Sequence, residues 1–299
     1  MNRTKYAKVK KDKSELVAET IGIVLSVFFL VVILIPVFNT IAKSVSSGTA
    51  ETSGSVIIFP VDFQLTTLKS ILTETDFLKS LGNTIIVTFF GTISSLFVSI
   101  LFAYALSSKY LRGKKFFTLL CIVGMVFKGG MVPTYMVMKG FGLLNNFLSL
   151  ILPASLNVFN MFVLRNYFDS LPDSVLESAS IDRASDFRTL ISIAIPMSVP
   201  CIATVGLLYS VSYWNGYFAP SLYISEPSMI TLQVLTRDLI SHAELLVDQL
   251  TRTQDMYGAL SFGTVAAGIT VLGSIPIILV YPLLQKYMTK GMTIGSVKE

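Results

Sequence analysis

Uncharged polar and aromatic side chains interrupt the apolar stretches of this chain at several points. The set comprises Asn83, Thr84, Tyr135, Asn157, Asn160, Tyr213, Trp214, Asn215 and Tyr217. Aromatic rings cover the C–H faces of a polyhydroxyl ligand and amides bond its hydroxyl groups, so these residue types suit an uncharged, sugar-like solute. They equally suit hydrogen bonds between helices and an aromatic belt at the membrane surface, and both interpretations stay open. The candidates for a solute pathway are Tyr135, Asn157, Asn160, Tyr213, Trp214 and Asn215.

Lys128 is the clear case of an ionisable residue inside an apolar stretch. It stands in the segment Phe-Lys-Gly-Gly-Met-Val-Pro. Charged residues within membrane spans are functional candidates by default. A lysine in the outer half of a span also reaches the membrane surface with its long side chain. We add Lys128 to the pathway candidates with both interpretations open.

Sequence motifs of common catalytic sites are absent. The chain contains no G-x-x-x-x-G-K-[ST] loop, no H-E-x-x-H and no G-x-S-x-G. Cys121 and Cys201 lie in apolar runs without disulfide or metal spacing, and His242 is the only histidine. We therefore expect no catalytic residues, no metal site and no cofactor bound by this chain.

Composition indicates a polytopic membrane protein. Hydrophobic residues make up 53% of the 299 residues and charged residues only 14%, whereas a soluble domain carries roughly 25% charged residues. A bilayer core takes about 20 apolar residues per helix, and only helices satisfy their own backbone there without closing a barrel. The prediction is an all-α fold with six transmembrane helices. The apolar windows are Thr20–Ala42, Leu81–Ser108, Phe116–Met138, Gly140–Leu164, a fifth within Thr189–Ser225, and Met256–Gln285, with Pro276 inside the last and Pro282 closing it.

Basic residues predict the orientation of these spans. With both termini inside, the inner segments 1–19, 109–115, 165–188 and 286–299 hold 16 of the 23 Lys and Arg residues, which favours an N-in, C-in topology. The net charge of +5 then reflects loop orientation rather than nucleic-acid binding. Two parts are expected: a basic cytoplasmic tail over 1–19, held near anionic lipid, and a membrane domain over 20–299.

A polar insert of about 168–196 separates the fourth and fifth windows. Ser174-Val-Leu-Glu177 has the form of a capping box, so a short helix is expected to start there. Asp182 and Ser185 are residue types that start helices. The apolar spacing after them predicts an amphipathic helix with Phe187, Leu190, Ile191, Ala194 and Ile195 on one face. The insert is therefore expected to form a helix, a bend and a second helix on the cytoplasmic side.

This insert carries a resemblance to a known family. Glu177-Ser-Ala-(x)3-Arg183-(x)9-Ile193-x-Ile-Pro196 resembles the E-A-A-(x)3-G-(x)9-I-x-L-P motif of ABC importer permeases. The chain departs from it at Ser178, Ile195 and Arg183, and Arg183 replaces a glycine that turns the backbone. Because only glycine takes positive φ freely, Arg183 implies a different bend or a strained one. Other segments resemble the carbohydrate-uptake, maltose-transporter-like branch: Asn83-Thr84, Ala103-Tyr-Ala-Leu-Ser with Gly113, Gly130-Met-Val-Pro-Thr-Tyr135, Gly142-Leu-Leu-Asn, Trp214-Asn215 and the tail from Gln285 to Lys298.

The resemblance implies a function and its partners. A second, similar permease, two ATPase subunits that use ATP and Mg, and an extracytoplasmic solute-binding protein would complete an importer in the bacterial cell membrane. Its fullest likeness is to permeases for complex oligosaccharides such as uronate-containing glycans. The insert would couple to the ATPase, with Glu177 pairing with an arginine there. The coupling residues would be Leu176, Glu177, Ser178, Ala179, Asp182, Arg183 and Ala184. Permeases for peptides or amino acids, and a stand-alone carrier or channel, are the alternatives.

Overall fold

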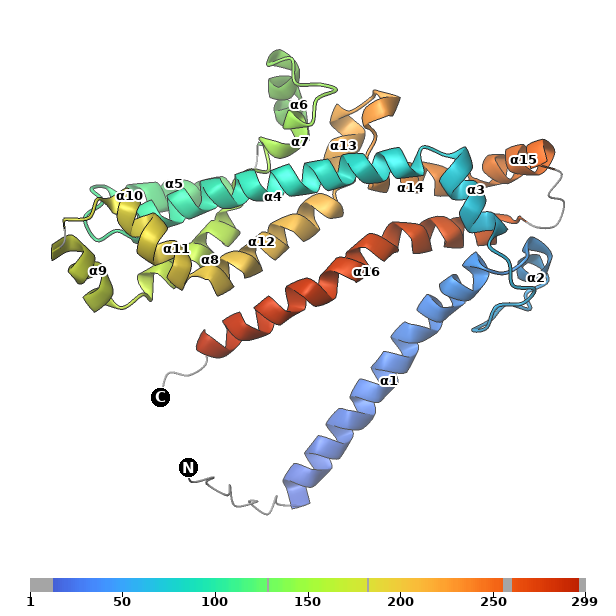
Figure 1. The fold of residues 1–299 in the computed structure, drawn as a ribbon, viewed down its shortest axis with the longest axis horizontal. Helices are drawn as coiled ribbons and strands as arrows, with labels where there is room; N and C mark the ends of the chain where they lie inside the picture. The colour runs from blue at the N-terminus through green and yellow to red at the C-terminus, as the bar shows by residue number, and fades with distance from the viewer. Residues whose placement is uncertain (1–12, 128, 182, 255–259, 296–299) are drawn as a thin grey trace. The chain divides into compact units, whose positions relative to one another are not determined.

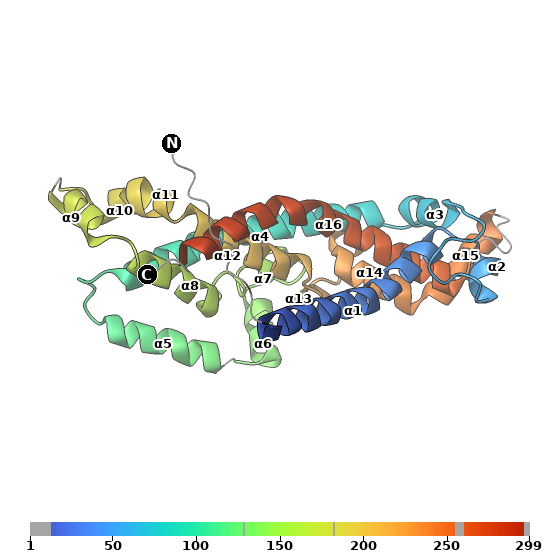
Figure 2. The same ribbon diagram turned by 90° about the horizontal axis from the view of Figure 1, so that it is seen from below.

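The computed structural model describes residues 13–127, 129–181, 183–254 and 260–295, and within these ranges it contains helices and no strand (Figure 1, Figure 2). The all-α prediction is confirmed. The long and medium helices are α1 (Lys13–Ser44), α4 (Phe77–Ser107), α5 (Lys114–Val126), α6 (Met131–Gly140), α8 (Val158–Asp169), α12 (Val199–Trp214), α14 (Leu232–Ser241), α15 (Ala243–Gln254) and α16 (Phe262–Gly295). Shorter elements connect them: α2 (Gly48–Thr52), α3 (Thr66–Glu74), α7 (Leu148–Ile151), α9 (Asp173–Ile181), α10 (Asp186–Thr189), η1 (Leu190–Ala194), α11 (Ile195–Met197), α13 (Phe218–Tyr223) and η2 (Pro227–Met229).

Three helical stretches in the described part of the chain are long and apolar enough to cross a membrane: Val17–Ser44, Phe77–Ser107 and Phe262–Leu279. Two bent helix pairs raise the number to five if each pair forms one span. They are α5 with α6, bent by 108°, and the run Asp186–Met197 with α12, bent by 84°. The chain is thus a multi-pass membrane protein.

The fourth predicted window, Gly140–Leu164, does not form one helix. The chain turns at Gly142 and Asn145, which have φ of 67° and 54°, then forms the single turn α7 and starts α8 at Val158. Pro153 stands in the break, where a continuous helix would need the backbone N–H that proline lacks. Apolar composition alone predicted a span here, and that prediction is wrong in extent.

The end predicted for the sixth window is also wrong. Pro282 does not close the last helix, because α16 continues to Gly295 with Pro276 and Pro282 inside it. Prolines are tolerated inside membrane helices because neighbouring groups satisfy the freed backbone carbonyl groups. A proline is therefore a weaker signal for the end of a helix in a membrane span than in a soluble protein.

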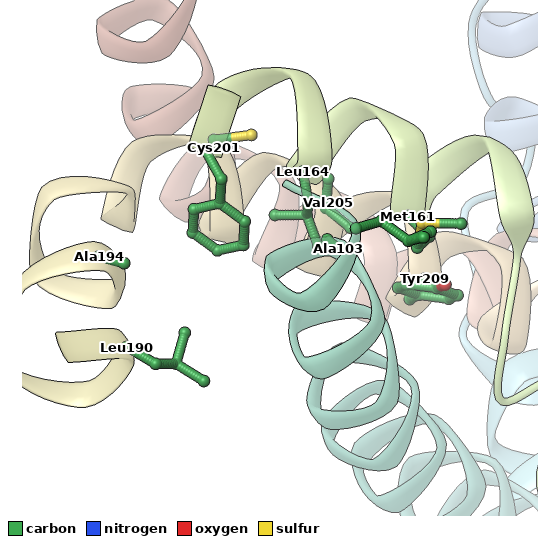
Figure 3. Close-up of a cluster of buried hydrophobic side chains, with 10 residues drawn as sticks. Ala103, Met161, Leu164, Leu190, Ala194, Cys201, Val205 and Tyr209 are labelled. Carbon is green, nitrogen blue, oxygen red and sulfur yellow. The ribbon is translucent and has the colours of Figure 1, made fainter. Parts of the chain in front are cut away.

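The chain divides into two compact units, one comprising residues 1–71 and 242–271 and the other residues 72–241 and 272–299. The second unit has a core in which α4, α8 and α12 meet, and Figure 3 shows Ala103, Met161 and Val205 from these three helices together. All three side chains are fully buried. Glycines permit the close approach of α4 and α12. A Cβ atom on Gly91 would lie 2.7 Å from the ring of Tyr213, and one on Gly206 would lie 3.1 Å from Leu96.

The first unit contains an acidic side chain held at the start of α16. Ser261 Oγ donates to Glu51 Oε2 at 3.0 Å, and Lys43 Nζ lies 3.1 Å from Glu51 Oε1. The carboxylate occupies the space that a Cβ on Gly263 would need. Ser261 Oγ also accepts the backbone N–H of Thr264 at 3.2 Å, which caps the helix. An anion at a helix N-terminus is stabilised by the helix dipole, so this contact fastens α2 to α16 within the unit.

Candidate functional site

The polar insert forms the predicted helix, bend and helix. The first helix, α9, begins at Asp173, so Ser174 is its second residue and not its cap. The second helix, α10, begins where predicted, because Ser185 Oγ accepts the backbone N–H of Arg188 at 3.3 Å. The helix–bend–helix prediction is therefore confirmed, with the first boundary moved by one residue.

The bend between α9 and α10 is left-handed at Arg183, which has φ of 52°. The backbone N–H of Ala184 donates to the carbonyl oxygen of Ala179 at 3.0 Å. This six-to-one bond across a left-handed residue is the Schellman ending of a helix, a position that glycine normally occupies. Of the two alternatives for Arg183, the structure has the strained bend.

The coupling candidates differ in their exposure. Glu177, Ser178 and Arg183 are exposed, Leu176 and Ala184 are half-buried, and Asp182 lies outside the described residues. Ala179 is only 6% exposed within this chain alone, so its side chain is buried in the insert and offers little surface to a partner. Ile181 is 81% exposed at the end of α9. Sequence reasoning missed Ile181, although an apolar residue four positions after Glu177 was a usable signal.

The predicted apolar face of the second helix is only partly buried. Leu190 and Ala194 pack into the core of the second unit, as Figure 3 shows. Phe187 and Ile191 are exposed instead. Between Leu190 and Ala194 the helix widens into a π-helical turn, which alters the register that a regular 3.6-residue period assumes. The predicted apolar face is therefore divided, with Leu190 and Ala194 in the core and Phe187 and Ile191 on the surface of this chain.

A hollow of about 650 Å³ lies among α8, α12 and the segment before α8. Its lining includes three of the predicted pathway residues, Asn157, Asn160 and Tyr213. The residues that line it are Val87, Gly124, Met125, Leu150, Pro153, Ala154, Leu156, Asn157, Val158, Phe159, Asn160, Leu208, Tyr209, Ser212, Tyr213, Gly216, Ala219 and Pro220. These described lining residues include amides and hydroxyls but no charged side chain.

The two asparagines in this lining have different tasks. Asn157 caps α8, because its Oδ1 accepts the backbone N–H of Asn160 at 3.1 Å. Asn160 is 6% exposed, and among the hydrogen bonds of the described residues none involves its side-chain amide. Its amide therefore keeps both donors and its acceptor for a solute or water in the hollow.

Two tyrosine–serine pairs build one wall of the hollow. Tyr209 and Ser99 share a hydrogen bond of 2.6 Å, and Tyr213 and Ser95 share one of 2.9 Å. Tyr209 Oη also accepts the backbone N–H of Asn157 at 3.0 Å. Sequence reasoning missed Tyr209, Ser95 and Ser99. The signal was present in the sequence: Ser95 and Ser99 are four residues apart, as are Tyr209 and Tyr213, and residues i and i+4 lie on one helix face.

The other pathway candidates lie elsewhere. The ring of Tyr135 stacks on the ring of Tyr223 with centroids 6.2 Å apart, and Tyr135 is not among the lining residues. Trp214 and Asn215 stand at the end of α12, outside the lining. Lys128 lies outside the described residues. The structure thus gathers Asn157, Asn160 and Tyr213 at one site and separates the others from it.

Comparisons with known proteins agree across most of the chain. The family described as "Binding-protein-dependent transport system inner membrane component" matches residues 9–294. The polygalacturonan/rhamnogalacturonan transport system permease protein YtcP of Bacillus subtilis is 36% identical over 90% of this chain and 94% of its own length. The arabinooligosaccharides transport system permease protein AraQ of Halalkalibacterium halodurans is 27% identical over 91% and 93%. A chain from the crystal structure of a bacterial ABC transporter involved in the import of the acidic polysaccharide alginate matches with a TM-score of 0.86 and 34% identity, covering 94% of this chain and 99% of that one.

Proposed function

Because the chain belongs to the family of binding-protein-dependent transport system inner membrane components, we propose that it is the permease subunit of an ATP-driven importer for an oligosaccharide. The observation that carries this proposal is the insert over α9 and α10. On the short helix α9, Glu177 and the apolar residue Ile181 at the end of the helix are both exposed. The bend that follows this helix is held by the hydrogen bond between the backbone N–H of Ala184 and the carbonyl oxygen of Ala179. Such a helix suits a groove on a partner protein.

The carbohydrate assignment rests on the relatives and on the lining of the hollow. The relatives are named for polygalacturonan, rhamnogalacturonan and arabinooligosaccharides, and the matching structure for alginate. Amides, hydroxyls and tyrosine rings in the lining suit sugar hydroxyls and C–H faces. Since the described lining has no charged side chain, this hollow favours contacts with hydroxyl groups over contacts with carboxylates.

The proposed assembly follows the family. This chain pairs with a second, similar permease, each of the two contacts one ATPase subunit, and an extracytoplasmic binding protein delivers the solute. ATP and Mg are used by the ATPase subunits, and this chain binds neither. The proposal includes six spans with both termini inside. It also includes the basic tail 1–19 and the membrane domain 20–299, with its insert at about 168–196. The long helices supply three of those spans by length and composition, and the bent pairs supply two more if each pair forms one span.

Coupling through α9 is tested with Glu177→Arg combined with Ile181→Asp. Both side chains are exposed in this chain, so the double variant is expected to fold and to lose both the ATPase on co-purification and sugar uptake in liposomes. The matched control is Tyr110→Asp, which changes a side chain that is 91% exposed outside α9 and is expected to retain both. If the double variant kept ATPase binding and uptake, the coupling assignment would be wrong.

The alternatives predict other results in the same assays. A stand-alone carrier or channel would transport solute in liposomes that contain this chain and no ATPase. A peptide or amino acid permease would take up those solutes in the full complex and leave oligosaccharides outside. ATP-dependent uptake of an oligosaccharide supports the proposal against both.

A further inference from the structure

An arginine of α14 lies against a tyrosine beside the hollow. Cζ of Arg237 is 4.6 Å from the ring centroid of Tyr217, which is within the range of a cation–π contact. Arg237 is exposed and Tyr217 is half-buried. Tyr217 stands between α12 and α13, and its neighbours Gly216 and Ala219 line the hollow. The pair of Arg237 and Tyr217 therefore adjoins the hollow.

The guanidinium of Arg237 has no acidic partner in the described part of the chain. Its side chain makes no ion pair and no hydrogen bond with a described residue. The next residue, Asp238, is acidic, but successive residues of an α-helix lie about 100° apart around its axis. The five N–H donors of the guanidinium therefore keep their capacity to bind an anion.

The helix that carries Arg237 lies at the end of α4 that is opposite to the insert (Figure 1). At that end Thr84 Oγ1 accepts the backbone N–H of Leu232, the first residue of α14, at 2.7 Å. At the other end Leu106 belongs to the same buried cluster as Leu190, which follows α10. Helix α4 rises about 33 Å from Thr84 to Leu106, and a bilayer core is about 30 Å thick. Because the insert is cytoplasmic in the proposed function, Arg237 lies on the extracytoplasmic side.

We propose that Arg237 and Tyr217 bind a uronate unit of an acidic oligosaccharide at the extracytoplasmic entrance to the hollow. This inference rests on the proposed function and names its class of solute. A guanidinium binds a carboxylate through two parallel hydrogen bonds, and an aromatic ring covers the C–H face of a sugar. The described lining of the hollow supplies amides and hydroxyls but no cation, and Arg237 supplies that charge for a sugar that carries a carboxylate.

A carboxylate on the solute-binding protein is the competing partner for an exposed arginine. An exposed ion pair between two proteins contributes little and needs no aromatic surface. The ring of Tyr217 and the adjoining hollow favour a sugar instead, because a sugar uses the cation, the ring and the hydroxyl-binding groups together. Docking of the binding protein at Arg237 is an outcome that the test distinguishes.

The test measures uptake by the complete importer in liposomes, with the solute-binding protein in excess. The solutes are trigalacturonate and its methyl ester, which has the same sugar rings without the charge. Arg237→Gln is expected to lower the initial rate of trigalacturonate uptake by about tenfold, because it removes a charge-assisted hydrogen bond, and to leave the rate with the ester unchanged. The matched control is Lys79→Gln, which removes an exposed cation in the first turn of α4 and should preserve both rates.

A second variant restores the charge chemically. Arg237→Cys is treated with a thiol reagent that adds an ammonium group, or with one that adds a sulfonate. The ammonium group is expected to recover most of the trigalacturonate uptake and the sulfonate none of it. The unsubstituted chain, treated in the same way, controls for Cys121 and Cys201. Co-purification of the ATPase subunits verifies that each variant is folded, and binding of the solute-free binding protein to each complex is measured separately.

The outcomes separate this inference from the proposed function. An equal loss with both solutes, or weaker binding of the solute-free binding protein to the Arg237→Gln complex, would assign Arg237 to docking of that protein. Unchanged trigalacturonate uptake by Arg237→Gln, or uptake of the ester alone by the unsubstituted complex, would overturn the uronate site and leave an importer for neutral oligosaccharides. Uptake of neither solute also overturns the site, and the proposed function fails only if neutral oligosaccharides are refused as well.

Discussion

The backbone N–H of Ala184 donates to the carbonyl oxygen of Ala179 at 3.0 Å, and this bond spans Arg183 in the left-handed conformation with φ of 52°. The chain therefore bends at Arg183 although it lacks the glycine of the motif that it resembles. A non-glycine residue in this conformation costs about 1–2 kcal/mol. Ala179, Arg183 and Ala184 together show that the hydrogen bond across the bend, and not a glycine, defines the turn.

Arg183→Gly is expected to stabilise the insert. Glycine adopts positive φ without the steric cost, although part of the gain is offset by its greater freedom in the unfolded chain, which leaves about 0.5–1 kcal/mol. The measurement is the thermal midpoint of the purified complex, with hydrogen exchange of the Ala184 amide as a local readout. Arg183→Ala is the control, because it removes the charge and keeps the strain. A gain in both variants would attribute the effect to charge.

Gly91→Ala is expected to destabilise the contact between α4 and α12. The new Cβ would lie 2.7 Å from the ring of Tyr213, and displacing that ring strains its bond to Ser95. Overpacking of this kind costs about 1–3 kcal/mol. Thermal unfolding of the complex is the measurement. Gly82→Ala on the same helix meets nothing within 4 Å, so it should be neutral or slightly stabilising. Equal losses in the two variants would contradict the prediction.

Substitutions of Asn157 and Asn160 are expected to have different effects, the first on stability and the second on transport. Asn157→Ala removes the cap of α8 and should cost about 0.5–2 kcal/mol, while Asn157→Ser retains a capping oxygen and should cost less. Asn160→Ala removes an amide that bonds no described side chain, so it should leave stability nearly unchanged and raise the solute concentration needed for half-maximal uptake. Unfolding and oligosaccharide uptake in liposomes are measured on all three variants. Unchanged uptake by Asn160→Ala would remove it from the pathway.

Gly263→Ala is expected to disrupt the start of α16. Its Cβ would take the space of the Glu51 carboxylate, which would lose its bond to Ser261 and its place at the helix N-terminus, an interaction of about 1 kcal/mol. Gly273→Ala on the same helix makes only an ordinary contact of 3.6 Å with Thr236 and serves as the control. The thermal midpoint of the complex should fall for the first variant and hold for the second. The opposite order would show that the carboxylate moves away freely.

Local patterns were sufficient for the insert because its signals act within a few residues. Ser185 caps α10 as its residue type predicts, and the bend falls at Arg183 where the motif has glycine. The membrane helices α1 and α4 were also predictable, since twenty or more apolar residues in sequence have few other stable states. The same rule failed over Gly140–Leu164, because hydropathy does not register the turn at Asn145 or the break at Pro153.

The sequence by itself determined that this chain is helical, embedded in a membrane and equipped with the ABC permease motif, because composition, periodicity and capping act locally. Only the tertiary structure decided which polar residues share a site. Asn160 and Tyr213 meet at one hollow while Tyr135 stacks on Tyr223 instead. It also decided that Ala179 is buried and Ile181 exposed. The hollow depends on how α4, α8 and α12 pack, and residues brought together by packing are distant in sequence, where no local pattern links them.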